Sequence, residues 1–265
     1  MKTRIVSALI MLPLMIVVYI GGYLLMGFCL LVGIVGLIEF YNAFEKIEVK
    51  ASKPFGMVAL AALYIVNLAG LSQLGGDSQQ GILLWIFFIV IGSLLYMFVP
   101  FEKRRPEDAF LTGFGILYVG YFSFHIILID QTAYFILVWL VFLTAFGTDI
   151  FAYFTGYLLG KHKLCPAISP KKTIEGAIGG VVGSVILTVA FVMIFQPELL
   201  LHSIVIGVLA SIISQFGDLT ASIIKRKIGI KDFGNLIPGH GGVLDRVDSV
   251  LFTAPFIYYY IIWII

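Results

Sequence analysis

Long apolar runs separated by short polar connections dominate the pattern along this chain. Most runs approach the roughly 20 residues that an α-helix needs to cross a bilayer. Within a run the apolar residues are continuous and do not alternate with polar ones, which excludes a membrane β-barrel. The pattern predicts nine helical segments, approximately over residues 5–20, 23–44, 54–73, 81–100, 109–129, 133–159, 176–196, 199–224 and 248–265.

Composition agrees with this prediction. Hydrophobic residues make up 60% of the 265 residues and charged residues 12%, whereas an ordinary soluble domain carries about 25% charged residues. We therefore predict an all-α, polytopic integral membrane protein with about nine transmembrane helices, five in residues 1–130 and four in residues 131–265. The two cysteines, Cys29 and Cys165, are expected to be packing residues and not a disulfide.

The positive charges predict the orientation of the helices. All 17 lysine and arginine residues lie before the first segment or in the connections that follow segments 2, 4, 6 and 8. Loops rich in lysine and arginine face the cytoplasm. We expect a cytoplasmic N-terminus, a C-terminus on the outer side, and a place in a bacterial inner membrane.

Two aspartates interrupt the apolar runs, Asp149 in the sixth segment and Asp218 in the eighth. An ionised carboxylate at the centre of a membrane helix costs at least about 2.5–3.5 kcal/mol, so it normally faces a polar cavity or a partner. Ser214, Asp218 and Ser222 share one helical stripe, which favours a cavity lining. For Asp149, a hydrogen bond to a neighbouring helix is the alternative.

Two polar stretches on the predicted cytoplasmic side carry further chemistry. One is "KHKLCPAISPKKTIEG" at residues 161–176, and the other begins at residue 225 and ends in "IPGHGGVLDRVDS". Asp245 and Asp248 in the second stretch, together with Asp218, suit a hard divalent cation such as Mg²⁺. Zinc is less suitable, because His240 stands alone.

The same stretches supply groups that suit a polyphosphate. The cations are Lys225, Arg226, Lys231 and Arg246, with Lys171 and Lys172 from the other stretch. Gly241 and Gly242 expose backbone N–H groups that can approach phosphate oxygens. The plainer alternative, lysines that contact anionic headgroups, explains the cations but not the aspartates interleaved with them.

The residues alone thus predict a membrane-embedded, cytoplasm-facing site for a divalent metal and a phosphate-rich ligand. A P-loop ATPase is excluded, because the sequence has no Walker A motif.

The stretch from Ser222 to Asp248 resembles the signature of the phosphatidate cytidylyltransferases, also called CDP-diacylglycerol synthases. The shared pattern is S-x-x-K-R, K-D, a small residue, P-x-H-G-G and D-R-x-D. A second element, S-P-x-K-T-x-E-G, matches "SPKKTIEG" at residues 169–176. The resemblance is close in the C-terminal half and rests on hydropathy alone in the N-terminal half. It implies Mg²⁺ dependence, CTP and phosphatidate as substrates, and CDP-diacylglycerol and pyrophosphate as products.

This resemblance, with the residue chemistry above, suggests a role for each polar side chain. Asp218 and Asp245 lead as Mg²⁺ ligands, with Asp248 and Asp149 as weaker candidates. Contacts to the reacting phosphates are expected from Lys225, Arg226, Lys231 and Arg246. Further substrate contacts are expected from Ser169, Lys172, Thr173, Ser222, Asn235, Gly241, Gly242 and Asp248. His240 either donates a hydrogen bond to a phosphate or stabilises its own loop.

The other expected partners are membrane lipids, and nucleic acid is not among them. A second cation and a homodimer are both compatible with the sequence. The rival hypothesis is a cation- or proton-coupled transporter of a phosphorylated solute. That hypothesis predicts an internal repeat and polar residues through to the outer face, and the sequence shows neither. A cytidylyltransferase for a different lipid phosphate would differ only in its acyl pocket.

Overall fold

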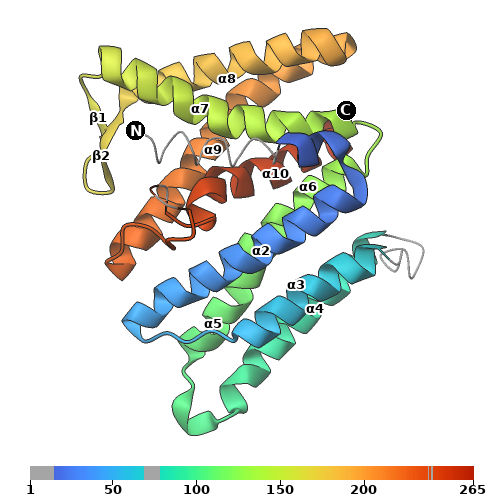
Figure 1. Ribbon diagram of the computed structural model, residues 1–265, viewed down its shortest axis with the longest axis vertical. Coiled ribbons are helices and arrows are strands. Elements are labelled where there is room, and N and C mark those ends of the chain that lie inside the picture. Colours follow the sequence, from blue (N-terminus) through green and yellow to red (C-terminus); the bar gives the residue numbers. More distant parts are fainter. Residues whose placement is uncertain (1–14, 69–77, 238, 240) are drawn as a thin grey trace.

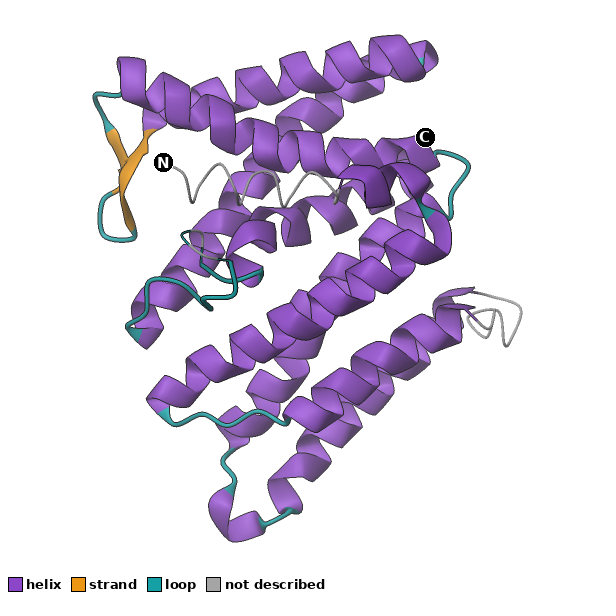
Figure 2. Cartoon of the chain, in the orientation of Figure 1, coloured by secondary structure: helices purple, strands orange, loops and turns teal. Residues whose placement is uncertain are grey.

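The computed structural model describes residues 15–68, 78–237, 239 and 241–265. These residues form a bundle of helices with one small β-hairpin (Figures 1 and 2). The helices are α2 (Gly22–Phe44), α3 (Lys53–Leu68), α4 (Ser78–Leu95), α5 (Pro106–Gly115), α6 (Phe122–Asp130), α7 (Val138–Leu159), α8 (Ile174–Phe195), α9 (Leu200–Ile228) and α10 (Leu244–Ile264), and the antiparallel hairpin pairs β1 (Lys163–Cys165) with β2 (Ser169–Thr173).

The apolar pattern predicted these helices well. Each of the predicted segments 2 to 9 coincides with helix, and seven helical stretches in the described residues are long and apolar enough to cross a membrane. Helix α3 is shorter, and the predicted continuation to residue 73 lies outside the described residues. So does most of the predicted first segment, although residues 15–20 are helical. The all-α membrane architecture is confirmed, whereas the count of nine remains a prediction.

The connections between helices sort to two ends of the bundle. Figure 1 shows the hairpin, the 229–243 loop and the connections at 45–52 and 96–105 toward one end. The connections at 131–137 and 196–199 lie toward the other end, as does the C-terminus. The described lysines and arginines all belong to the first group of connections or to the helix ends that lead into them. This arrangement agrees with the charge segregation read from the sequence, and the cytoplasmic orientation of that end stays a prediction.

Glycines let the helices of the C-terminal half pack closely. A Cβ at Gly176 would lie 2.7 Å from the Ala152 carbonyl oxygen and 3.2 Å from the Cα of Gly156, so α8 meets α7 backbone to backbone. Small residues at such a contact let two membrane helices approach closely. A Cβ at Gly217 would lie 2.9 Å from the Asp248 carbonyl oxygen, which brings α10 equally close to α9.

Helix α2 links the N-terminal helices to the C-terminal half. Its Phe40 is fully buried. The Phe40 ring packs against Tyr118, in a π-helical stretch between α5 and α6, with centroids 5.6 Å apart. It also packs against Phe233 of the 229–243 loop, with centroids 6.0 Å apart. This turn of α2 therefore packs against the 229–243 loop.

Single cysteines should report the orientation of the bundle. The native Cys165 is first changed to serine, because it is half-exposed in the hairpin, while Cys29 is buried. New cysteines at the exposed positions Ala133 and Glu198 should react with a membrane-impermeant maleimide in intact cells. A cysteine at the exposed Lys163 should react only after permeabilisation. Protection of either outer position in intact cells would contradict the predicted orientation.

Candidate functional site

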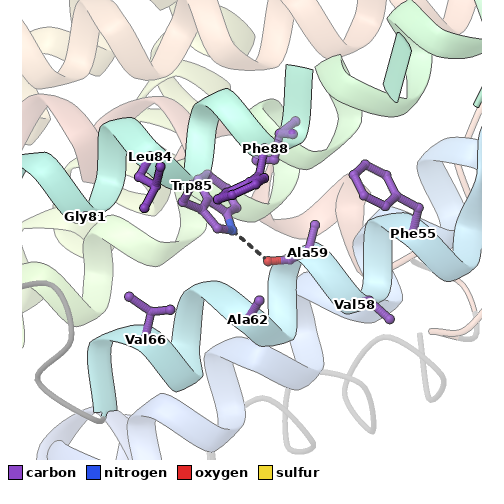
Figure 3. Close-up of a pocket in the computed structure, with 10 residues that line it drawn as sticks. Phe55, Val58, Ala59, Ala62, Val66, Gly81, Leu84, Trp85 and Phe88 are labelled. Carbon is purple, nitrogen blue, oxygen red and sulfur yellow. Dashed lines mark hydrogen bonds between the residues drawn. The ribbon is translucent and has the colours of Figure 1, made fainter. Parts of the chain in front are cut away.

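An apolar groove of about 580 Å³ lies between α3 and α4 (Figure 3). The hydrogen bond drawn across it joins the Trp85 indole N–H to the Ala59 carbonyl oxygen at 2.8 Å. The residues that line it carry no charged side chain for a phosphate or a metal. The polar chemistry predicted from the sequence therefore belongs elsewhere, at the two polar loops.

The base of the hairpin is fixed by Glu175, in the first turn of α8. Its carboxylate accepts hydrogen bonds from the backbone N–H groups of Lys161 at 3.1 Å and His162 at 3.2 Å, and contacts the His162 Nδ1 at 2.6 Å. The Thr173 hydroxyl caps α8 by accepting from the Gly176 N–H at 3.1 Å. Thr173 is only 6% exposed. The structure thus gives this predicted substrate-binding residue a structural role.

Lys172 links the hairpin to α9. It extends from β2, and its Nζ forms an ion pair with the Asp218 carboxylate on α9. The two side chains are 28% and 24% exposed, so both remain accessible. Ser169, at the other end of β2, is half-buried. This ion pair joins the 161–176 stretch to α9, and the second stretch contacts the hairpin through the Arg226 Nε–Ile168 carbonyl hydrogen bond at 3.4 Å.

Two further aspartates, Asp149 and Asp248, lie near the Asp218 of this ion pair. Asp248 lies within electrostatic range of Asp218 and Asp149, and Asp149 lies within range of Asp218. The close contact of α9 with α10 at Gly217 explains the first of these approaches. Like charges that are held close repel one another. Within the described structure, this repulsion is offset by Lys172 beside Asp218 and by Lys225 beside Asp248.

Asp245 has its oxygens engaged by the protein. One oxygen accepts from the Lys225 Nζ at 2.8 Å, and the other accepts from the backbone N–H groups of Phe233 at 2.8 Å and Gly242 at 3.0 Å. The Asp245 side chain is only 1% exposed. The Lys225 Nζ also lies 4.0 Å from an Asp248 oxygen, so it links the two aspartates. Asp245 and Lys225, both expected at the reacting groups, thus hold the loop against α9 and α10.

Two arginines expected to contact phosphates are placed differently. Arg226 is exposed and donates to the carbonyl oxygens of Ile230 at 3.2 Å and Ile168 at 3.4 Å, which ties the loop to the hairpin. Arg246 is half-buried and lies within electrostatic range of Asp149. Its Nε is buried and has no hydrogen-bond partner among the described residues. Arg246 thus places a positive charge near Asp149, and its buried Nε is unpaired among the described residues.

The other predicted contacts surround the loop. Ser222 is half-buried on α9, and Lys231 and Asn235 are exposed. Gly241 has a φ of 85°, a left-handed conformation that favours glycine. Gly242 is buried, with its N–H directed to Asp245. His240 lies outside the described residues.

One acidic residue that contacts the site, Glu39 on α2, is absent from the residues predicted from the sequence. Its carboxylate accepts from the backbone N–H groups of Val243 at 3.1 Å and Leu244 at 2.8 Å. The signal was present, because Glu39 interrupts an apolar run just as Asp149 and Asp218 do. The energetic cost that singled out those two aspartates applies equally to this glutamate.

The chemistry of the donors fits a hard divalent cation. Asp218 and Asp248 offer carboxylate oxygens, and Mg²⁺ is usually held by one or two carboxylates, with waters and substrate phosphates completing its shell. Within the described part of the chain, no group of three or more His, Cys, Asp or Glu side chains is placed to hold a metal ion. A bound Mg²⁺ would therefore depend on water and phosphate oxygens for its remaining ligands.

Comparison with known proteins gives full-length matches. The model of the cytidylyltransferase family matches residues 2–264. A phosphatidate cytidylyltransferase of Staphylococcus haemolyticus is 37% identical, over 96% of this chain and 94% of that protein. One of Bacillus subtilis is 31% identical, over 98% and 97%. One of Brucella abortus is 33% identical, over 97% and 92%. The similarity therefore includes the N-terminal helices as well as the two polar stretches.

Proposed function

The chain belongs to the cytidylyltransferase family, and we propose that it transfers the cytidylyl group of CTP to phosphatidate, giving CDP-diacylglycerol and pyrophosphate. The observation that carries this proposal is the grouping of charged side chains around Asp218 of α9. Lys172 reaches it from the hairpin, and Asp248 lies beside it at the start of α10. Acidic and basic groups are thus concentrated where a nucleotide and a lipid phosphate have to be held together.

The reaction forms one P–O bond and breaks another. A phosphate oxygen of phosphatidate attacks the α-phosphorus of CTP in line, and pyrophosphate leaves. The attacking phosphate is already largely a dianion at pH 7, because its second pKa is about 6. A strong general base is therefore unnecessary, and the main obstacle is the repulsion between two polyanions.

The basic residues of the site would offset that repulsion. Arg246 offers its available guanidinium donor from α10, Lys172 approaches from the hairpin, and Lys231 extends from the exposed part of the loop. These cations would orient both phosphates and stabilise the charge that develops on pyrophosphate. Lys225, already engaged by two aspartates, would keep the acidic side of the site in place.

We also propose that the reaction depends on Mg²⁺. Asp218 and Asp248 are the first candidates to hold it, with Asp245 and Asp149 as further ones. The ion would supply positive charge to the phosphates of CTP and help to align them.

The proposed position of the site suits its two substrates. CTP is soluble in the cytoplasm, whereas phosphatidate is held in the membrane leaflet. The basic end of the bundle, which we assign to the cytoplasmic face of a bacterial inner membrane, would be open to both.

Two radiolabelled forms of CTP test the proposed reaction. The purified protein in detergent is given phosphatidate, Mg²⁺ and CTP labelled at either the α- or the γ-phosphate. Label from the α-position should enter the lipid fraction, and label from the γ-position should appear in pyrophosphate. Diacylglycerol, which lacks the attacking phosphate, should give no labelled lipid. Transfer of the γ-label to lipid would mean a kinase, and labelled lipid formed in the presence of a chelator would contradict the Mg²⁺ dependence.

A further inference from the structure

Glu39 is a buried carboxylate in an otherwise apolar helix. It lies in the stretch Gly22–Ile47, whose mean hydropathy reaches 2.2, and it is only 8% exposed. A carboxylate in such a place requires strong partners. The next residue, Phe40, packs on Phe233 of the 229–243 loop. Glu39 is thus placed on the turn of α2 that faces this loop.

The partners of Glu39 are the first N–H groups of α10. The first N–H groups of a helix lack acceptors within the helix itself. Val243, at the N-cap of α10, supplies no side-chain cap. Glu39 accepts from Val243 and Leu244 instead, from a distance of about 200 positions along the chain. Its negative charge also lies at the positive end of the helix dipole, where it is most favourable.

Two glycines of the loop leave room for this carboxylate. A Cβ at Gly234 or at Gly242 would collide with the Glu39 side chain. Gly242 was expected to expose its backbone to phosphate, but its N–H is bound to Asp245. At these two positions, glycine is needed because the glutamate occupies the space that a side chain would take.

We infer that Glu39 is a positioning residue, which fixes the 229–243 loop and the first turn of α10. Asp245, Arg246 and Asp248 all lie in or next to that turn, so their directions depend on it. Asp245 holds the loop from one side through Phe233, and Glu39 holds the start of α10 from the other. The catalytic consequence rests on the proposed function, whereas the structural part stands on these contacts alone.

Glu39→Gln is the first test, because it keeps the size of the side chain. It removes the charge and leaves one of the two backbone N–H groups facing an amide NH₂. Loss of charged hydrogen bonds of this kind should lower kcat by about 10-fold to 100-fold. The KM for CTP should change much less, because Glu39 does not contact the substrate. The matched control is Glu45→Gln just past the end of α2, where the exposed Glu45 forms an ion pair with Lys53 at 2.8 Å. That variant should keep the parental kcat.

Limited trypsin digestion of the full chain in detergent gives a readout that needs no activity. Lys231 is an exposed cleavage site in the loop, and Lys163 is an exposed cleavage site in the hairpin. In Glu39→Gln, cleavage at Lys231 should be faster while cleavage at Lys163 stays parental. If the parent protein forms no labelled lipid from CTP, the proposed function fails, and the digestion still decides the role of Glu39.

The packing of Gly242 gives a second variant. Gly242→Ala should also lower kcat and speed cleavage at Lys231, because its new methyl group pushes the Glu39 carboxylate away from the Val243 and Leu244 N–H groups. Combined with Glu39→Ala, it should add little further loss, because the group with which it collides is gone. Parental kcat or parental cleavage at Lys231 in Glu39→Gln would each overturn the inference. Equal acceleration at Lys231 and Lys163, or full additivity of the two alanine variants, would overturn it as well.

Discussion

Exchanging Asp218 for asparagine should reduce turnover to background. The change keeps the shape of the side chain but removes the charge that pairs with Lys172 and that would hold Mg²⁺. Asp248→Asn should have the same effect, because Asp248 lies in the same electrostatic cluster. The measurement is α-labelled lipid formed from CTP at saturating Mg²⁺, with size-exclusion chromatography in detergent as the check of folding.

A matched charge change separates this effect from the general charge of that end of the molecule. Glu107→Gln removes a negative charge from an exposed position at the same end, and it should leave turnover at the parental rate. Asp245→Asn should also lose activity, but with faster trypsin cleavage at Lys231, because Asp245 binds the loop backbone. Substantial turnover by Asp218→Asn would remove Asp218 from the proposed metal site.

Arg246→Ala should lower the turnover number by at least about 100-fold, in line with the 2.7–4 kcal/mol typical of one preorganised donor. Arg246 lies near Asp149, and its Nε has no hydrogen-bond partner among the described residues. A charge that stabilises the transition state should affect kcat and not only KM. Arg246→Lys keeps the charge but loses the planar set of guanidinium donors, so its decrease in kcat should be intermediate.

The control for Arg246 is Lys103→Ala, at an exposed position of the same end. Arg104 is less suitable, because its guanidinium lies 4.2 Å from the centroid of the Tyr96 ring. General attraction to anionic lipid would treat Arg246 and Lys103 alike, and it is screened by salt. The comparison should therefore use one lipid mixture and one ionic strength. Equal, small losses in the two alanine variants would show that Arg246 serves only the membrane surface.

The helices could be predicted because their signal is local. A run of apolar residues indicates a membrane helix without any knowledge of distant contacts. The predicted segments 2 to 9 therefore lie close to the described helices. The hairpin was not predicted, because β1 has only three residues and lies in a basic, proline-containing stretch. Its form depends on Glu175 and on the cap at Thr173, which are contacts with the start of α8.

The site could be predicted as a set of residues but not as an arrangement. The sequence indicated that Asp218, Asp245 and Asp248 act together. It could not show that Asp245 binds backbone N–H groups of the loop, because that depends on how the loop folds back. Glu39 escaped notice for a related reason. Its partners lie about 200 positions away, and no motif surrounds it.

The Lys172–Asp218 ion pair also bears on how the chain is inserted during synthesis. Lys172 precedes Asp218 by 46 positions, so it leaves the ribosome first. Lys225 likewise precedes Asp245 by 20 positions. Asp218 and Asp245 thus each have a counter-ion that is already made when their own helix enters the bilayer. Biogenesis of the bundle therefore does not have to wait for CTP, phosphatidate or a metal to neutralise these two carboxylates.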